Sequence, residues 1–248
     1  MSKITISSVL LLLCGSMAWG ATGDLTFMKQ PPQATSYSRM HASKFVHGGA
    51  DQAKGLVNEH SVVGELQGAV GGVKVAIDSA KADATQPDLI RLDFSGKGMF
   101  KGAPTAAIKM RPAQTNVTMG TIGPVLMIVK RDGRSVPVSV RGTYWKQAKS
   151  RGLSLMMTAA VEGSCKFGDK TYPVRIIDGN GNFQFSDALK PPYRPSTMMA
   201  FDKIMVGTDD GKFPSSAATS YVGQPIFIDG KLYSVDVTDM KIKSAPMK

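Results

Sequence analysis

Short runs in which apolar and polar residues alternate are the feature that most restricts the fold of this 248-residue chain. A period of two places one set of side chains on a buried face and the other set in water, as in a half-buried β-strand. The runs lie at 73–77, 90–94, 136–140 and 172–176. Pro137 and Pro173 interrupt two of them and remove a backbone donor, which predicts that these strands are sheet edges or lie next to bulges.

Three turn sequences join apolar runs and predict hairpins. They lie at Asp132-Gly133, Gly168-Asp169 and Asp229-Gly230. Asp-Gly is typical of type I′ turns, which need positive φ at both central residues. Helical signals are weaker, because glycines interrupt the one candidate helix at 50–66. The predicted fold class is therefore mainly β, an antiparallel meander that forms a sandwich or an open barrel with little helix.

The first twenty residues have the parts of a cleavable secretory signal peptide. Lys3 supplies a positive charge, residues 4–14 are largely apolar, and Ala18 and Gly20 are the small residues expected before a cut after Gly20. Acylation of Cys14 is an alternative, although Leu13 stands where such signals carry a small residue. No later apolar run is long enough to span a bilayer. The pattern predicts a secreted or periplasmic protein with no transmembrane segment after cleavage.

The rest of the chain divides by composition. Residues 21–55 contain Pro31-Pro32 and Gly48-Gly49 and few periodic apolar positions, which predicts an extended leader or linker. Residues 56–248 are expected to form a β-rich domain, and the sequence leaves open whether this domain divides into two subdomains. A connection rich in Pro, Ser and Met is predicted at about 190–219, with a short strand at 203–206 inside it.

The chain carries 30 Lys and Arg against 19 Asp and Glu, a net charge of +11 that falls by one when Lys3 leaves with the signal. A positive field favours anionic partners, such as an acidic polysaccharide or an envelope surface. Lys146, Lys149 and Arg151 form the densest basic group. No aromatic residues alternate with a basic stripe, so specific nucleic-acid binding is not expected, and a solvated basic surface is the alternative.

Cleavage of the signal leaves Cys165 as the sole cysteine, which excludes an intramolecular disulfide. A buried thiol is the default for such a residue. A cysteine nucleophile would need a histidine partner, and His41, His47 and His60 all lie far upstream. The spacing of these histidines fits no compact metal-binding pattern.

One loop has the composition of a calcium site. Asp178, Asn180, Asn182 and Asp187 place side-chain oxygens along a glycine-containing stretch, as in the first half of an EF-hand loop. Phe183 stands where that loop has its glycine, and a leucine replaces the bidentate glutamate. Asn and Gly also favour ordinary turns. The sequence thus leaves two interpretations, a calcium loop and a structural turn between strands.

The D-G-N-G-N-F loop at 178–183 and the I-D-G-K-L-Y-S-V hairpin at 228–235 together resemble exported, uncharacterised bacterial proteins that pair a D-x-N-x-N loop with such a hairpin. The resemblance covers the last third of the chain. It implies a bacterial envelope or extracellular setting and carries no assigned activity.

Enzyme signatures are missing from the sequence: it has no G-x-S-x-G, no G-x-x-x-x-G-K-[ST] and no H-E-x-x-H. Three functional hypotheses follow. The first is a non-catalytic envelope or extracellular structural protein, and the second is a binding module for an anionic glycan or surface. The third is a hydrolase with an unrecognised pair of carboxylates. Four residues are candidates for that pair: Asp88, Asp93, Asp178 and Asp202.

Overall fold

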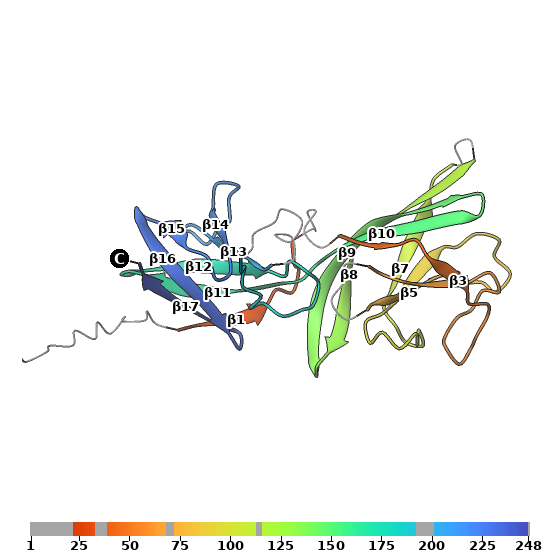
Figure 1. The fold of residues 1–248 in the computed structure, drawn as a ribbon, viewed down its shortest axis with the longest axis horizontal. Coiled ribbons are helices and arrows are strands. Elements are labelled where there is room, and N and C mark those ends of the chain that lie inside the picture. Colours follow the sequence, from red (N-terminus) through yellow and green to blue (C-terminus); the bar gives the residue numbers. More distant parts are fainter. Residues whose placement is uncertain (1–21, 33–38, 68–71, 113–115, 192–200, 248) are drawn as a thin grey trace, which may run out of the picture.

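The computed structural model describes residues 22–32, 39–67, 72–112, 116–191 and 201–247. Every regular element in these ranges is a β-strand, and all strand pairs are antiparallel, which confirms the predicted fold class. A membrane-spanning apolar helix does not occur in the part of the chain that the structure describes. The strands form two lobes, which lie side by side along the long axis of the molecule (Figure 1).

The first lobe is a nine-stranded sheet that closes into a barrel. Its strand order is β2-β10-β9-β8-β7-β6-β5-β4-β3. β2 and β3 are consecutive in sequence yet lie at opposite ends of this order, so the sheet must curl round. The backbone of His41 in β2 pairs with Gln67 after β4, with N···O distances of 3.0 and 2.7 Å, and this contact joins the two ends. The strands are β2 (Arg39–Ala42), β3 (Phe45–His47), β4 (Val62–Glu65), β5 (Lys74–Asp78), β6 (Leu89–Asp93), β7 (Thr105–Met110), β8 (Val117–Arg131), β9 (Arg134–Gln147) and β10 (Ser150–Thr158).

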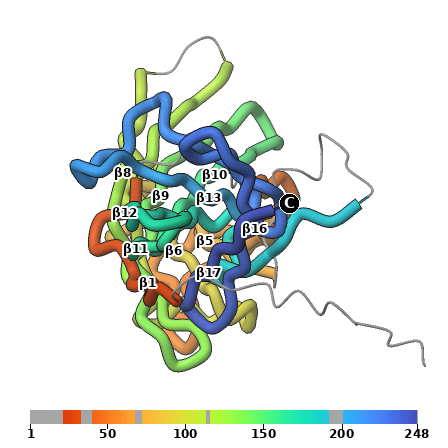
Figure 2. The backbone as a smooth tube through the Cα atoms, turned by 90° about the vertical axis from the view of Figure 1, so that its left-hand side faces the viewer, coloured from red at the N-terminus to blue at the C-terminus, as the bar shows by residue number. Residues whose placement is uncertain are grey.

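The second lobe is an eight-stranded sheet that also curls toward closure. Its order is β14-β13-β12-β11-β1-β17-β16-β15. Figure 2 views the molecule along its long axis with this lobe toward the viewer and the C-terminus on it. The strands are β1 (Gly23–Phe27), β11 (Ala160–Phe167), β12 (Lys170–Ile177), β13 (Lys203–Val206), β14 (Ala218–Tyr221), β15 (Ile226–Ile228), β16 (Lys231–Thr238) and β17 (Lys241–Pro246).

The three predicted hairpins are confirmed as β8–β9, β11–β12 and β15–β16. At the tips of the first and third, both central residues have positive φ, as a type I′ turn requires. The strand predicted at 203–206 is also confirmed, as β13.

Residues 21–55, expected to form a leader, instead supply β1, β2 and β3. β1 lies in the middle of the second sheet, between β11 and β17. Its five residues include one fully buried apolar side chain, Leu25. A strand this short shows little alternation, which is why the composition of the segment suggested a linker. The predicted signal peptide, residues 1–20, lies outside the described residues.

The two alternating runs that Pro137 and Pro173 interrupt form β9 and β12, which lie inside their sheets and are not the predicted edges. β10 pairs with β9 only as far as Ser139, and β13 pairs with β12 only as far as Val174. Pro137 and Pro173 therefore lie just past the end of a neighbouring strand. Because β10 and β13 have already ended, the N–H that each proline lacks breaks no hydrogen bond to these neighbouring strands. A bulge does face β9, between Ile122 and Val125 of β8.

Candidate functional site

A pocket of about 720 Å³ opens at the end of the first barrel that lies away from the second lobe. β9 turns into β10 at this end, whereas the other end of β10 leads into β11 of the second lobe. The tip of the β9–β10 hairpin forms one wall of the pocket. β3, the start of β4 and the loop between β5 and β6 form the other wall. Barrel mouths are common ligand sites, and this volume suits a small molecule.

Basic and imidazole side chains surround the opening. The lining includes His47, His60, Lys146, Lys149 and Arg151. Four of them are exposed and Arg151 is partly exposed, so together they form a rim that faces water. Val62, Ile77 and Tyr144 are buried and form the floor. The pocket thus offers positive charge at its rim and mainly apolar contact at its floor.

The register of the β9–β10 hairpin explains how these side chains reach the pocket. Lys146 pairs directly with Arg151. Because side chains alternate along a strand, Tyr144, Lys146 and Arg151 share the inner face of the hairpin. Trp145 lies on the opposite face, where its indole covers Gly152. A Cβ atom at Gly152 would come within 2.4 Å of that ring.

Asp78 is the one acidic residue among the described residues that line the pocket, and its charge is already compensated. Its carboxylate accepts hydrogen bonds from the Asn58 backbone N–H at 3.0 Å, the Ser61 hydroxyl at 2.5 Å and Arg91 Nε at 2.6 Å. Burial acts to raise the pKa of Asp78, but these bonds outweigh it and hold the pKa below its ordinary value. The field inside the pocket therefore remains positive.

The same network fixes the wall that faces the hairpin. The Asn58 side chain is 3% exposed and donates to the carbonyl oxygens of Lys81, Ala82 and Ala84 at 2.9, 3.1 and 2.8 Å. Its own carbonyl accepts the backbone N–H of His60 at 2.7 Å. These bonds tie the loop that carries His60 to the loop after β5. The positions of both loops are thus set before a ligand arrives.

The hydroxyl of Tyr144 is a buried polar group that its packing does not explain. The residue is 1% exposed, and its hydroxyl has no hydrogen-bond partner in the part of the chain that the structure describes. Burial raises the pKa of the phenol, and the positive charge of Arg151 opposes that rise. A buried polar group without a partner costs about 1–3 kcal/mol, so a phenylalanine would suit the core better. Because Tyr144 also lines the pocket, its hydroxyl is a candidate contact for a ligand.

The four residues predicted to bind calcium come together in the loop after β12. The carboxylate of Asp178, 1% exposed, accepts the backbone N–H groups of Asn180, Gly181 and Phe183 at 3.1, 2.7 and 2.8 Å. These three bonds bend the chain round the carboxylate. They also engage both of its oxygen atoms within the loop.

The side-chain amides of Asn180 and Asn182 bind Asp187 and not Asp178. Each donates its side-chain N–H to Asp187 Oδ2, at 2.8 and 2.7 Å. The side-chain oxygen atoms accept the backbone N–H groups of Asn182 and Gln184, which fixes the orientation of both amides. No group of three or more His, Cys, Asp or Glu side chains within the described ranges is arranged to hold a metal. Calcium binding at this loop stays a prediction.

A further carboxylate, Asp202, lies beside the loop. It is fully buried and accepts two backbone N–H groups of the loop, at 3.0 and 2.8 Å. Burial raises the pKa of Asp178 to about 6, and burial together with the charge of Asp178 raises the pKa of Asp202 to about 8. Two of the four hydrolase candidates are thus neighbours, but they are sealed inside the protein. The other two, Asp88 and Asp93, bind N–H groups of their own turns.

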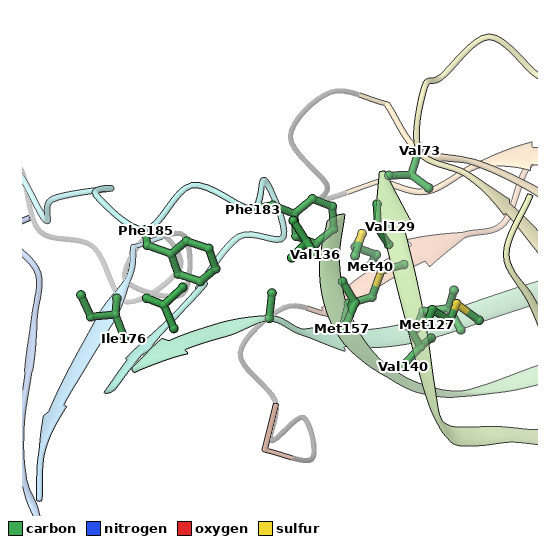
Figure 3. Close-up of a cluster of buried hydrophobic side chains, with 14 of the residues drawn as sticks. Met40, Val73, Met127, Val129, Val136, Val140, Met157, Ile176, Phe183 and Phe185 are labelled. Carbon is green, nitrogen blue, oxygen red and sulfur yellow. The ribbon is translucent and has the colours of Figure 1, made fainter. Parts of the chain in front are cut away.

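The loop after β12 also packs the two lobes against each other. Phe183 points toward the first barrel, where its ring centroid lies 5.7 Å from that of Phe94 and where Val136 is a neighbour (Figure 3). Phe185, two residues later, packs against Phe27 of β1 with ring centroids 5.8 Å apart. The loop therefore has a structural role between strands and between lobes.

Cys165 is buried in β11 of the second lobe, and burial raises the pKa of its thiol. His41, His47 and His60 belong to the first barrel. The structure places the thiol and the imidazoles in different lobes, so it does not assemble a Cys-His pair from them.

Sequence reasoning identified the basic group at 146–151, which forms one wall of the pocket. It missed Asn58, Asp78 and Tyr144, because nothing in their local sequence connects them with that group. Comparison of the chain with protein-family models, with curated proteins and with solved structures finds no match. The chemistry of the pocket is therefore the guide to its function.

Proposed function

We propose that this chain is an exported binding module for an anionic ligand, with the barrel-mouth pocket as its binding site. The observation that carries the proposal is the lining: five basic or imidazole side chains surround a pocket whose one acidic residue among those described is already paired with Arg91. Positive charge gathered round a concave surface attracts anions and raises their local concentration. Export is supported by the signal-like residues 1–20.

An acidic polysaccharide of the envelope or the extracellular space is the class of ligand that this setting favours. Salt screens attraction between exposed charges. The protein is therefore expected to be retained on heparin and on polygalacturonate at low salt and to elute as the salt concentration rises. Retention that is equal at low and high salt would favour the structural-protein hypothesis instead.

A pair of charge reversals separates the pocket from the general positive charge. K146E/K149E removes two exposed cations from the rim, whereas K231E/K241E makes the same change of net charge on the second lobe. We expect K146E/K149E to elute at clearly lower salt than both K231E/K241E and the unaltered protein. Equal elution of the two variants would show that retention depends on net charge alone. For export, the N-terminus of the mature protein is expected at Ala21.

A further inference from the structure

Tyr144 and Arg151 both line the pocket and are diagonal neighbours on one face of the β9–β10 hairpin. Tyr144 pairs with Leu153 across the hairpin, and Arg151 is two residues before Leu153 on the same face. Diagonal neighbours of this kind have Cα atoms about 7–8 Å apart, within reach of an aromatic and a long side chain. The positive charge of Arg151 acts on the phenol, which agrees with this placement.

These two groups suit an oxyanion. The phenol offers one O–H donor that no described residue uses, and the guanidinium offers a planar fork of N–H donors that matches a carboxylate or a phosphate. An anion placed between them would satisfy the hydroxyl that the core leaves without a partner. The oxyanion would lie below the rim of lysines, so it would have to be carried on a group narrow enough to enter the pocket.

The wall that faces the hairpin has a different chemistry. Phe45 and Pro87 line the pocket and are half-buried, next to the buried Val62 and Ile77. Gln86, which also lines the pocket, is exposed and carries an amide. Apolar surface with a few polar groups is typical of a pocket that holds a ring with hydroxyl substituents. A sugar ring with an acidic substituent combines both requirements.

We infer that the pocket takes a single acidic sugar unit, with its oxyanion between the Tyr144 hydroxyl and the Arg151 guanidinium and its ring against Phe45. This inference rests on the proposed function and names the unit of the anionic ligand that is recognised. A carboxylate and a phosphate ester share the chemistry, and the experiment distinguishes them. Tyr144 and Arg151 are then the residues that determine specificity.

Isothermal titration calorimetry of the full mature chain tests the inference with four probes. Glucuronate and glucose 6-phosphate carry a ring and an oxyanion, glucose carries the ring alone, and acetate carries the oxyanion alone. We expect at least one of the two acidic sugars to bind about tenfold or more tightly than glucose and acetate. The tighter of the two identifies the oxyanion. Binding of glucose with the same affinity as both acidic sugars would overturn the inference.

Tyr144→Phe removes the hydroxyl alone. It is expected to weaken binding of the acidic sugar about tenfold and to leave the melting temperature unchanged or higher, because the hydroxyl has no partner among the described residues. Arg151→Gln is expected to weaken binding at least as much. Tyr233→Phe changes a buried tyrosine of the second lobe and is expected to leave affinity unchanged.

The outcomes separate the two proposals. Unchanged affinity in both Tyr144→Phe and Arg151→Gln would overturn the assignment of the oxyanion site. If salt-dependent retention on heparin is lost in K146E/K149E while neither acidic sugar binds, the proposed function stands and the present inference fails. If retention does not depend on salt or on the rim lysines, the proposed function itself fails.

Discussion

Asp202 is fully buried, next to the Asp178 carboxylate and two backbone N–H groups of the loop after β12. Its folded-state pKa of about 8 lies above the ordinary value of 3.8. Between these values the folded chain holds a proton that the unfolded chain releases, so stability falls as pH rises. Urea denaturation is therefore expected to show a lower free energy of unfolding at about pH 8 than at about pH 5. Asp178, whose pKa is raised to about 6, contributes to this decrease in the part of the range below about pH 6.

Asp202→Asn is the control for this pH dependence, because an amide does not titrate. The variant is expected to lose part of its stability, because its amide nitrogen cannot accept one of the two backbone N–H groups that Asp202 accepts, and to show a smaller change between the two pH values. An undiminished change would contradict the assignment to Asp202.

Melting curves with Ca²⁺ and with EDTA test the predicted calcium loop in the same region. Bound calcium would raise the melting temperature, and identical curves would count against it.

At the scale of single residues, the sequence predicts the parts of the site that are close together in the chain. Lys146, Lys149 and Arg151 stand out because they lie within six positions. Asn58 and Asp78 do not stand out in the sequence, because Asn and Asp are common near turns for backbone reasons alone. Tyr144 reads as a core residue of an alternating strand. Its significance lies in a missing partner, and only the folded arrangement shows that.

Gly123 is the residue on which the shape of β8 depends. The register between β8 and β9 shifts between Ile122 and Val125, and the paired contact with β7 ends at Ile122. Beyond this point β8 and β9 continue as a long hairpin at the end of the first barrel nearest the second lobe (Figure 1). Gly123 has φ of +63°, and a Cβ atom there would lie 2.3 Å from the carbonyl oxygen of Val140. The bulge thus needs glycine for conformation and for space.

Gly123→Ala is expected to destabilise the protein by more than about 2 kcal/mol, because it adds a backbone clash to an unfavourable φ. Gly133→Ala is the matched control. Gly133 has φ of +73° but no heavy atom within 4 Å of the added Cβ, so it measures the conformational cost alone, about 1 kcal/mol. Chemical denaturation of both variants gives the two values. Equal losses would show that the chain relaxes round the clash.

At the scale of elements, strands with alternation or glycine turns are predictable, as is the short β13, whereas β1, β2 and β3 are not. Asp132-Gly133 and Asp229-Gly230 mark their hairpins because glycine adopts positive φ without strain. The β16–β17 turn has the same conformation at Asp239 and Met240, with φ of 50° and 60°, but no glycine marks it. β1 is missed for a related reason. It becomes a central strand only through partners more than a hundred residues away, at Val161–Gly163.

The whole molecule is built by insertion of one lobe into the other. The chain begins the second lobe with β1, forms the entire first barrel from β2 to β10, and then returns to pair β11 with β1. Buried residues of both lobes belong to one continuous hydrophobic cluster. The loop after β12 adds to this continuity through Phe183, which comes from the second lobe and packs against Phe94 of the first. We therefore expect the unaltered protein to unfold in one cooperative transition.

Phe183→Ala is expected to separate the lobes. Truncation of a buried phenylalanine costs about 3–5 kcal/mol, and here the loss falls on the contact between the lobes, so calorimetry should show two transitions in place of one. Phe185→Ala removes a side chain of similar burial that packs within the second lobe against Phe27. That variant should melt at lower temperature but still in one transition. If both variants showed two transitions, or if neither did, Phe183 would not be the residue that couples the lobes. The coupling would then depend on the crossing from β10 to β11.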